Sequence, residues 1–189
     1  EYYKISDLTR DACIFEEAKN VRLKVGIIDL STLGKIEVTG PDTVEFLNRI
    51  YTGRFDEVKV GMTRYGLMCD ESGVVVDDGI IGRLADEVFN LTTTTSGSDA
   101  IYKSMSRSIM EWGLDVAVTN LTSHFLAMNI AGPLARDVLQ PVTDIDLSEE
   151  AFPYLALREG AVAGVPARVS RAGFVSKLGY EIHLPADGG

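Results

Sequence analysis

The sequence predicts an α+β fold in which helices pack on antiparallel sheets. Short segments alternate polar and apolar residues, a turn joins two of them as a hairpin, and other segments repeat apolar residues at helical spacing. With 46% hydrophobic and 24% charged residues, this chain of 189 residues can build a sizeable core. We expect two similar α/β subregions, roughly at residues 25–115 and 116–189.

The first predicted elements are a helix over residues 12–23, a short apolar run at 25–31 and a strand at 35–39. Gly40 and Pro41 follow the strand. Proline suits the first turn of a helix because its missing N–H would have no partner there. The helix carries apolar residues at helical spacing, namely Val44, Phe46, Leu47, Ile50 and Tyr51.

A hairpin, two further strands and a second helix complete the first half. The turn at residues 70–73 contains the Asp, Ser and Gly that tight turns favour. Ser98 can cap the helix and Gly113 can end it. The strands are expected at residues 65–69, 74–76, 88–95 and 116–119, and the helix places on one face Ile101, Met105 and Ile109.

The pattern of strand, Gly-Pro and helix returns 92 positions later. Gly132 and Pro133 follow the apolar run 128–131 as Gly40 and Pro41 follow residues 36–39. This separation is too long for a solenoid, so the pattern indicates two similar halves. Two more strands are expected, at residues 162–169 and 177–184.

The bulk composition argues against several classes of protein. A net charge of -10 opposes nucleic-acid binding, because phosphate contacts need Lys and Arg. No segment reaches the ~18 apolar residues of a membrane helix, and the N-terminus has no signal-peptide pattern. Cys13 and Cys69 are far apart, so we expect reduced thiols and a cytoplasmic setting. With two histidines in the chain, we expect no metal site.

Two adjacent acids, Asp77 and Asp78, follow a run of three valines. On a strand their side chains would point to opposite faces, so one of them could face a buried pocket. A carboxylate there can stabilise a developing cation or take a proton. The alternative is a pair of solvated turn acids beside Gly79.

Other polar segments also allow two interpretations. The four threonines at residues 92–95 fit a β-edge, or a row of hydroxyls that lines a polar ligand. Gly173 and Gly179 fit a plain hairpin, or backbone positions closed to other residues. His124 and His183 fit surface or core histidines.

Five segments in order resemble the folate-binding aminomethyltransferase family, whose type member is the glycine cleavage system T-protein. They are residues 25–32, 35–41, 64–79, 130–133 and 178–182. Finer details resemble the branch of this family found in sarcosine oxidase alpha subunits. These details are at residues 31–35, 46–51, 92–95 and 152–153, and the whole resemblance covers roughly residues 20–185.

The resemblance implies the N-terminal portion of the aminomethyltransferase fold, with a central cavity for tetrahydrofolate. It implies that the methylene of an oxidised N-methyl amine such as sarcosine is captured there as methylenetetrahydrofolate. Asp77 would be the catalytic carboxylate, acting on cationic species or on a proton. Flavin and NAD would act only in the intact complex, with other sarcosine oxidase subunits as partners. The folate-binding residues implied are Tyr65, Leu67, Thr94, Lys177 and Glu181.

Two departures from the family pattern stand out. The family has Gly-Glu where this chain has Ser176 and Lys177, and that glutamate grips the pterin ring. Lysine has only donors, so it cannot accept the pterin's donor hydrogens. The family also continues beyond this sequence into a C-terminal β-barrel, so we expect the cavity to be open or incomplete.

Two other functions stay open. Lys177 suggests an enzyme of the same superfamily that uses a different one-carbon donor. The chain could also be a non-catalytic folate-binding or scaffold module that pairs with an enzyme subunit.

Overall fold

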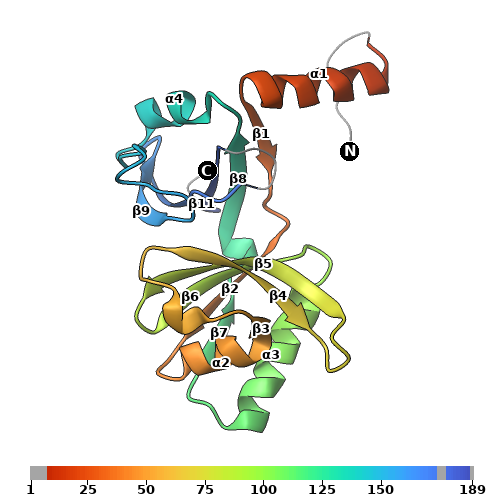
Figure 1. Cartoon of the computed structure of the whole chain (residues 1–189), viewed down its shortest axis with the longest axis vertical. Coiled ribbons are helices and arrows are strands. Elements are labelled where there is room, and N and C mark those ends of the chain that lie inside the picture. Colours follow the sequence, from red (N-terminus) through yellow and green to blue (C-terminus); the bar gives the residue numbers. More distant parts are fainter. Residues whose placement is uncertain (1–7, 174–177, 188–189) are drawn as a thin grey trace.

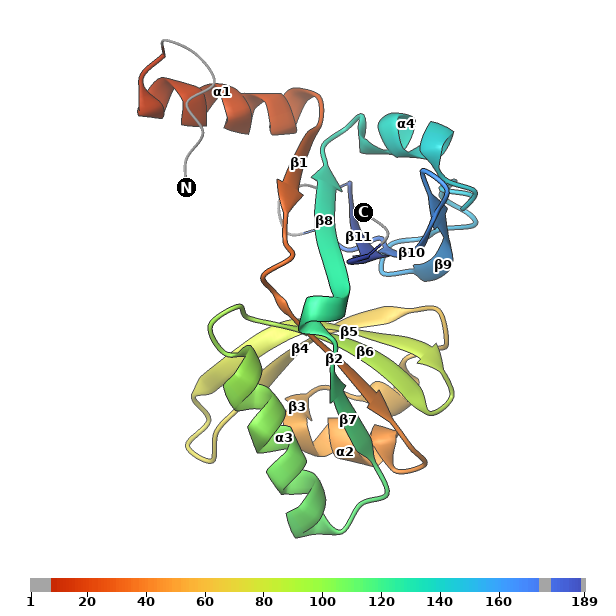
Figure 2. The same cartoon turned by 180° about the vertical axis from the view of Figure 1, so that it is seen from behind.

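Two antiparallel β-sheets make up the body of the molecule in the computed structural model, which describes residues 8–173 and 178–187 (Figure 1). Helices α2 and α3 cover the outer face of the six-stranded sheet, and α4 lies beside the five-stranded sheet (Figures 1 and 2). The helices are α1 Arg10–Leu23, α2 Thr43–Ile50, α3 Ser98–Trp112 and α4 Ala135–Leu139, with single 3-10 turns at Phe55–Glu57, Thr122–His124 and Gln140–Val142.

The six-stranded sheet has the order β3-β4-β5-β6-β2-β7. Its strands are β2 Gly34–Thr39, β3 Tyr51–Thr52, β4 Thr63–Cys69, β5 Val75–Ala85, β6 Val88–Thr93 and β7 Ala117–Asn120. The five-stranded sheet has the order β1-β8-β11-β10-β9. Its strands are β1 Gly26–Asp29, β8 Phe125–Ala131, β9 Leu157–Val162, β10 Val165–Ser170 and β11 Gly179–Pro185.

Side-chain alternation gives each sheet an apolar outer face and a more polar inner face. One core joins β2, β4, β5 and β6 to α2 and α3, with Ile36, Phe89, Leu91 and Met105 fully buried. A second core joins β8, β10 and β11 to α4. The inner faces meet each other, because an ion pair joins Glu37 on β2 to Arg168 on β10 at 3.6 Å.

The glycines of the two Gly-Pro segments share one backbone conformation. Gly40 and Gly132 have φ angles of +127° and +129°, and a Cβ at either would lie 2.4 Å from a carbonyl oxygen, that of Asp115 or of Lys24. Each glycine ends a strand and precedes a helix. The same close approach in both copies explains why glycine stands at both positions.

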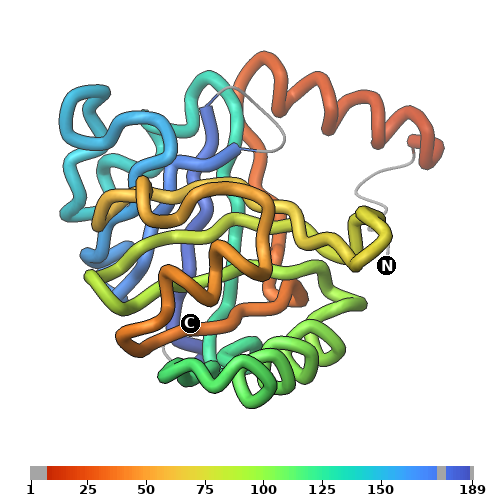
Figure 3. Tube along the Cα trace, turned by 60° about the horizontal axis from the view of Figure 1, so that its bottom comes forward, coloured from red at the N-terminus to blue at the C-terminus, as the bar shows by residue number. Residues whose placement is uncertain are grey.

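Each half also gives one strand to the other across the expected boundary at residues 115 and 116. β1 pairs with β8 in the five-stranded sheet, and β7 pairs with β2 in the six-stranded sheet. The helices that precede these two strands, α1 before β1 and α3 before β7, pack differently. α3 packs on the first core, whereas α1 projects beside β1 with Phe15 and Leu23 exposed (Figures 2 and 3).

Three local predictions from the sequence were wrong. Gly97, not Ser98, is the cap of α3, and the Ser98 hydroxyl lies 3.4 Å from that of Thr122. Pro41 lies in a turn ahead of α2, because the Gly40 carbonyl accepts hydrogen bonds from both the N–H and the hydroxyl of Thr43. The expected strand at residues 162–169 is two strands, since positive φ angles at residues 163 and 164 close a tight hairpin there.

The predicted α+β class is confirmed, with antiparallel sheets and packed helices and no closed barrel among the described residues. Gly113 ends α3 in the left-handed conformation, as predicted, with a φ of +64°. Within residues 8–173 and 178–187, no helix is long and apolar enough to span a membrane.

Candidate functional site

A cavity of about 620 Å³ lies between the inner faces of the two sheets. Its apolar lining includes Ile28, Leu30, Leu33, Ile80 and Leu155. Its polar lining includes Tyr65, Asp78, the threonines at 92–94, Asn129, Tyr154 and Glu181. Both sheets therefore supply side chains to one site.

The two adjacent acids lie on opposite faces of β5. Asp78 pairs with Leu67 across the strands and lines the cavity. Asp77 pairs with the core residue Met68, is 3% exposed and faces the helices instead. Both acids are on a strand rather than in a turn. Gly79 follows them because a Cβ there would lie 1.9 Å from the carbonyl oxygen of Thr92.

Tyr65 and Asp78 form a hydrogen-bonded pair in the cavity wall. The Tyr65 hydroxyl donates to Oδ2 of Asp78 at 2.5 Å. This hydrogen bond to a carboxylate raises the pKa of Tyr65 above its usual range. The same contact orients one carboxylate oxygen of Asp78 toward Tyr65.

Asp77 supports the cavity from behind. Its Oδ1 accepts the backbone N–H of Thr94 at 3.1 Å, which holds the end of β6 in place. Its Oδ2 is buried and makes no hydrogen bond within the described part of the chain. The hydroxyl of Tyr51 is buried in the same way, and burial raises the pKa of Tyr51 far above the usual range, with further contributions from the charges of Asp77 and Asp78.

The threonine row begins on an interior strand rather than at an edge, with Thr92 and Thr93 ending β6. β6 pairs with β5 on one side and with β2 on the other. Thr92 is buried, and its hydroxyl oxygen accepts the N–H of Ile80 at 2.9 Å. Thr92, Thr93 and Thr94 all line the cavity.

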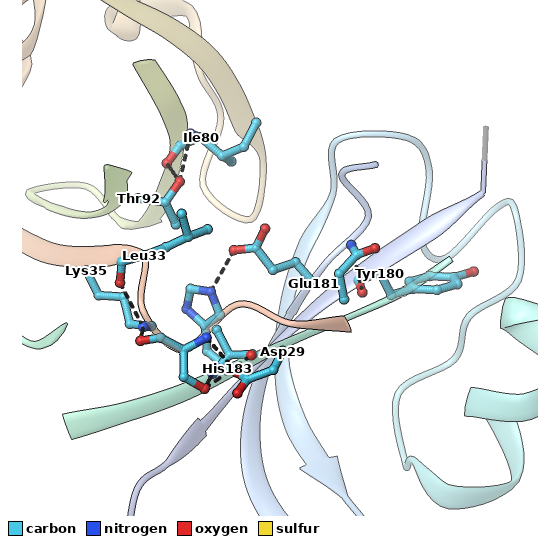
Figure 4. A network of polar contacts seen from close by, with 11 residues as sticks. Asp29, Leu33, Lys35, Ile80, Thr92, Tyr180, Glu181 and His183 are labelled. Atoms are coloured by element: carbon cyan, nitrogen blue, oxygen red, sulfur yellow. Dashed lines mark hydrogen bonds and ion pairs between the residues drawn. The ribbon is translucent and has the colours of Figure 1, made fainter. Parts of the chain in front are cut away.

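The opposite wall carries Glu181 and Asn129, which pair directly across β11 and β8. Oε1 of Glu181 lies 2.7 Å from Nε2 of His183 (Figure 4). The Asn129 amide donates to the carbonyl of Tyr180 at 3.3 Å, whereas its buried Oδ1 makes no hydrogen bond to any described residue. This wall therefore offers acceptor oxygens to a ligand.

A buried lysine on β2 of the six-stranded sheet acts on Glu181 electrostatically. Nζ of Lys35 donates to the carbonyls of Ser31 at 2.9 Å and Leu33 at 3.0 Å (Figure 4). Burial lowers the pKa of Lys35, although the charges of Glu181 and Asp29 act in the opposite direction.

The structure brings three of the predicted folate-binding residues into the lining of one cavity, with Tyr65 and Thr94 on one wall and Glu181 on the other. Leu67 faces the inner side of β4 opposite Asp78 but does not line the cavity. Lys177 lies outside the described residues. Sequence reasoning missed Asn129, although an amide inside the apolar run 128–131 was a signal that could have found it.

Comparison with known proteins confirms the family resemblance. The family model described as the GCVT N-terminal domain matches residues 1–189. The chain is 42% identical over 180 residues to sarcosine oxidase subunit alpha from Corynebacterium sp. (strain P-1), covering 93% of this chain and 19% of that protein. It is 34% identical over 179 residues to an aminomethyltransferase from Listeria monocytogenes serotype 4b (strain F2365), covering 94% of this chain and 48% of that protein.

The fold comparison agrees. The crystal structure of glycine cleavage system aminomethyltransferase T from Bartonella henselae matches with a TM-score of 0.80 and 26% identity, over 92% of this chain and 45% of that one. The chain thus spans about half the length of the aminomethyltransferases it matches and about a fifth of the sarcosine oxidase alpha subunits. With a family model matched along its whole length, this chain belongs to the GCVT N-terminal domain family.

Proposed function

We propose that this chain binds tetrahydrofolate between its two sheets and serves one-carbon transfer in a longer protein. The observation that carries this proposal is the cavity of about 620 Å³ with acceptor oxygens on both walls. Its volume falls within the range of about 300–1,000 Å³ that is typical of small-molecule sites.

The chemistry of the cavity fits a pterin ring. A pterin is flat and carries N–H donors along one edge, so it needs apolar faces and acceptors. Ile28, Leu30 and Leu33 supply apolar surface, while Glu181 and Oδ1 of Asn129 supply acceptors. A buried amide oxygen without a partner is costly, and a ligand donor would satisfy it.

In this proposal Asp78 is the carboxylate at the reacting centre and Asp77 positions the wall behind it. Tetrahydrofolate, when bound, supplies the nitrogens that accept the methylene group. The Asp78 carboxylate stabilises the cationic character of an iminium donor or takes a proton, and Tyr65 orients it. The catalytic role predicted for Asp77 thus becomes a supporting one, because its oxygen holds the N–H of Thr94.

The similarity to sarcosine oxidase alpha subunits supports a wider proposal for the longer protein. There, sarcosine or another N-methyl amine is oxidised outside this region by flavin and NAD chemistry, with other subunits as partners. This region then captures the released methylene on tetrahydrofolate. We propose a cytoplasmic setting for that protein.

Calorimetric titration of the chain with tetrahydrofolate tests the binding step. Glu181→Gln replaces one acceptor oxygen by a donor and is expected to weaken binding about tenfold or more. Glu87→Gln makes the same change at an exposed site, and we expect no change in affinity. Absence of binding by the unmodified chain, or equal loss in both variants, contradicts the proposed site.

A further inference from the structure

His183 contacts Glu181, which lines the cavity. The two side chains stand two positions apart on β11 and therefore on the same, inner face of the sheet. Because a carboxylate oxygen can only accept, Nε2 of His183 donates to Oε1 of Glu181 at 2.7 Å (Figure 4). His183 is 6% exposed and does not line the cavity itself.

The first half of the fold forms the equivalent pair of strands without a carboxylate and a histidine at these positions. Glu181 pairs with Asn129, which lies three residues before Gly132, and Asn90 pairs with Glu37, which lies three residues before Gly40. Asn90 is thus the counterpart of Glu181 in the other sheet. By the same register the counterpart of His183 is Thr92, so the sheet forms there without a carboxylate and a histidine.

The charge environment of Glu181 also differs from that of Glu37, an acid on the inner face of the other sheet. Glu37 on the inner face of β2 is paired with Arg168 at 3.6 Å. Among the described residues, Glu181 has no lysine or arginine within ion-pair distance, and its ion-pair partner is His183. Lys35 acts on Glu181 from farther away, with Nζ bonded to two backbone carbonyls. A largely buried carboxylate that lacks a lysine or arginine partner is a candidate for contact with a ligand.

We propose that His183 is a positioning residue. It ties down Oε1 of Glu181 and leaves Oε2, which makes no hydrogen bond within the described part of the chain, for an N–H donor of the ligand. The proposal rests on the proposed folate-binding function. The part of the ligand that Glu181 would accept a hydrogen bond from is a nitrogen heterocycle with N–H donors along one edge, such as the pterin.

A double-mutant cycle separates positioning from a structural role. The chain is titrated with tetrahydrofolate as the unmodified protein and as His183→Leu, Glu181→Gln and the double variant. We expect His183→Leu to weaken binding about tenfold in the unmodified background and less than about threefold in the Glu181→Gln background, because positioning requires the carboxylate. His183→Gln, which keeps an N–H donor, should restore affinity to within about threefold.

The controls locate the effect. His124→Leu makes the same change at the exposed histidine and should leave the affinity unchanged. p-Aminobenzoylglutamate, the part of folate without the pterin, should lose no affinity in His183→Leu. Equal losses in both backgrounds, or no rescue by His183→Gln, would overturn the positioning role.

A spectroscopic measurement tests the contact between His183 and Glu181 even if the chain binds no tetrahydrofolate. The ¹⁵N resonance of His183 Nε2 reports its hydrogen bond to the carboxylate, and it should shift in Glu181→Gln but not in Glu87→Gln. Absence of binding with this shift present would reject the proposed function and keep the pair. Absence of the shift would reject the pair itself.

Discussion

Asp77 and Asp78 are neighbours in the chain but lie on opposite faces of β5. Asp78 lines the cavity and accepts a hydrogen bond from Tyr65, whereas Asp77 is buried on the helix side and accepts the N–H of Thr94. Adjacent positions on a strand thus give two carboxylates two different environments. The proposed roles, with Asp78 at the reacting centre and Asp77 supporting the wall behind it, follow from this arrangement.

Asp78→Asn should lower methylene transfer by the longer protein by about 10²-fold or more, because the negative charge beside the reacting centre is lost. Asp77→Asn keeps an oxygen for the N–H of Thr94 and should cost less than about tenfold. The measurement is the rate of methylenetetrahydrofolate formation from sarcosine. A larger loss for Asp77→Asn would restore the catalytic role that the sequence predicted for Asp77.

Tyr51→Phe should change how stability depends on pH. Burial raises the pKa of Tyr51 in the folded state, so the unfolded chain ionises first, above about pH 10, and stability is lost as pH rises further. The phenylalanine variant lacks this loss. Its free energy of unfolding relative to the unmodified chain should therefore rise by about 1 kcal/mol between pH 9 and 11.

Urea unfolding at several pH values measures this difference. At neutral pH the variant loses no hydrogen bond to a described residue, so we expect equal or higher stability. Tyr154→Phe, at an exposed tyrosine, is the matched control. Parallel stability curves for Tyr51→Phe and the unmodified chain would argue against the buried, ionisable hydroxyl.

Gly40→Ala and Gly132→Ala should each destabilise the chain by more than about 1 kcal/mol, because the new Cβ meets a carbonyl oxygen and the positive φ disfavours alanine. Gly73→Ala has a positive φ of +82° but no atom within 4 Å of the new Cβ, so it should cost less. Thermal unfolding compares the three variants. If Gly73→Ala is as costly as the other two, the close approach in the repeated turn is not the cause.

The repeated strand, Gly-Pro and helix could be predicted from the sequence because it depends on local conformation. The exchange of β1 and β7 between the sheets could not, since it depends on pairing between residues far apart in the chain, such as Gly26 with Ala131 and Thr39 with Ala117. The alternation of side chains along a strand predicts that Asp77 and Asp78 face opposite sides of the sheet. It does not predict which side faces the cavity, because that depends on where the five-stranded sheet packs. That Asn129 lines the cavity depends on how the two sheets face each other, although its place in an apolar run was a signal in the sequence.

Mapping of tetrahydrofolate on the ¹⁵N-labelled chain by NMR tests the central claim most directly. Binding between the sheets predicts that backbone amide signals shift at Gly79, Thr94, Asn129 and Glu181, which surround the cavity from both sheets. The amide of Met110, exposed on α3, should stay unchanged. Shifts confined to α3 and its neighbours, or no shifts at millimolar ligand, would contradict a folate site in this cavity.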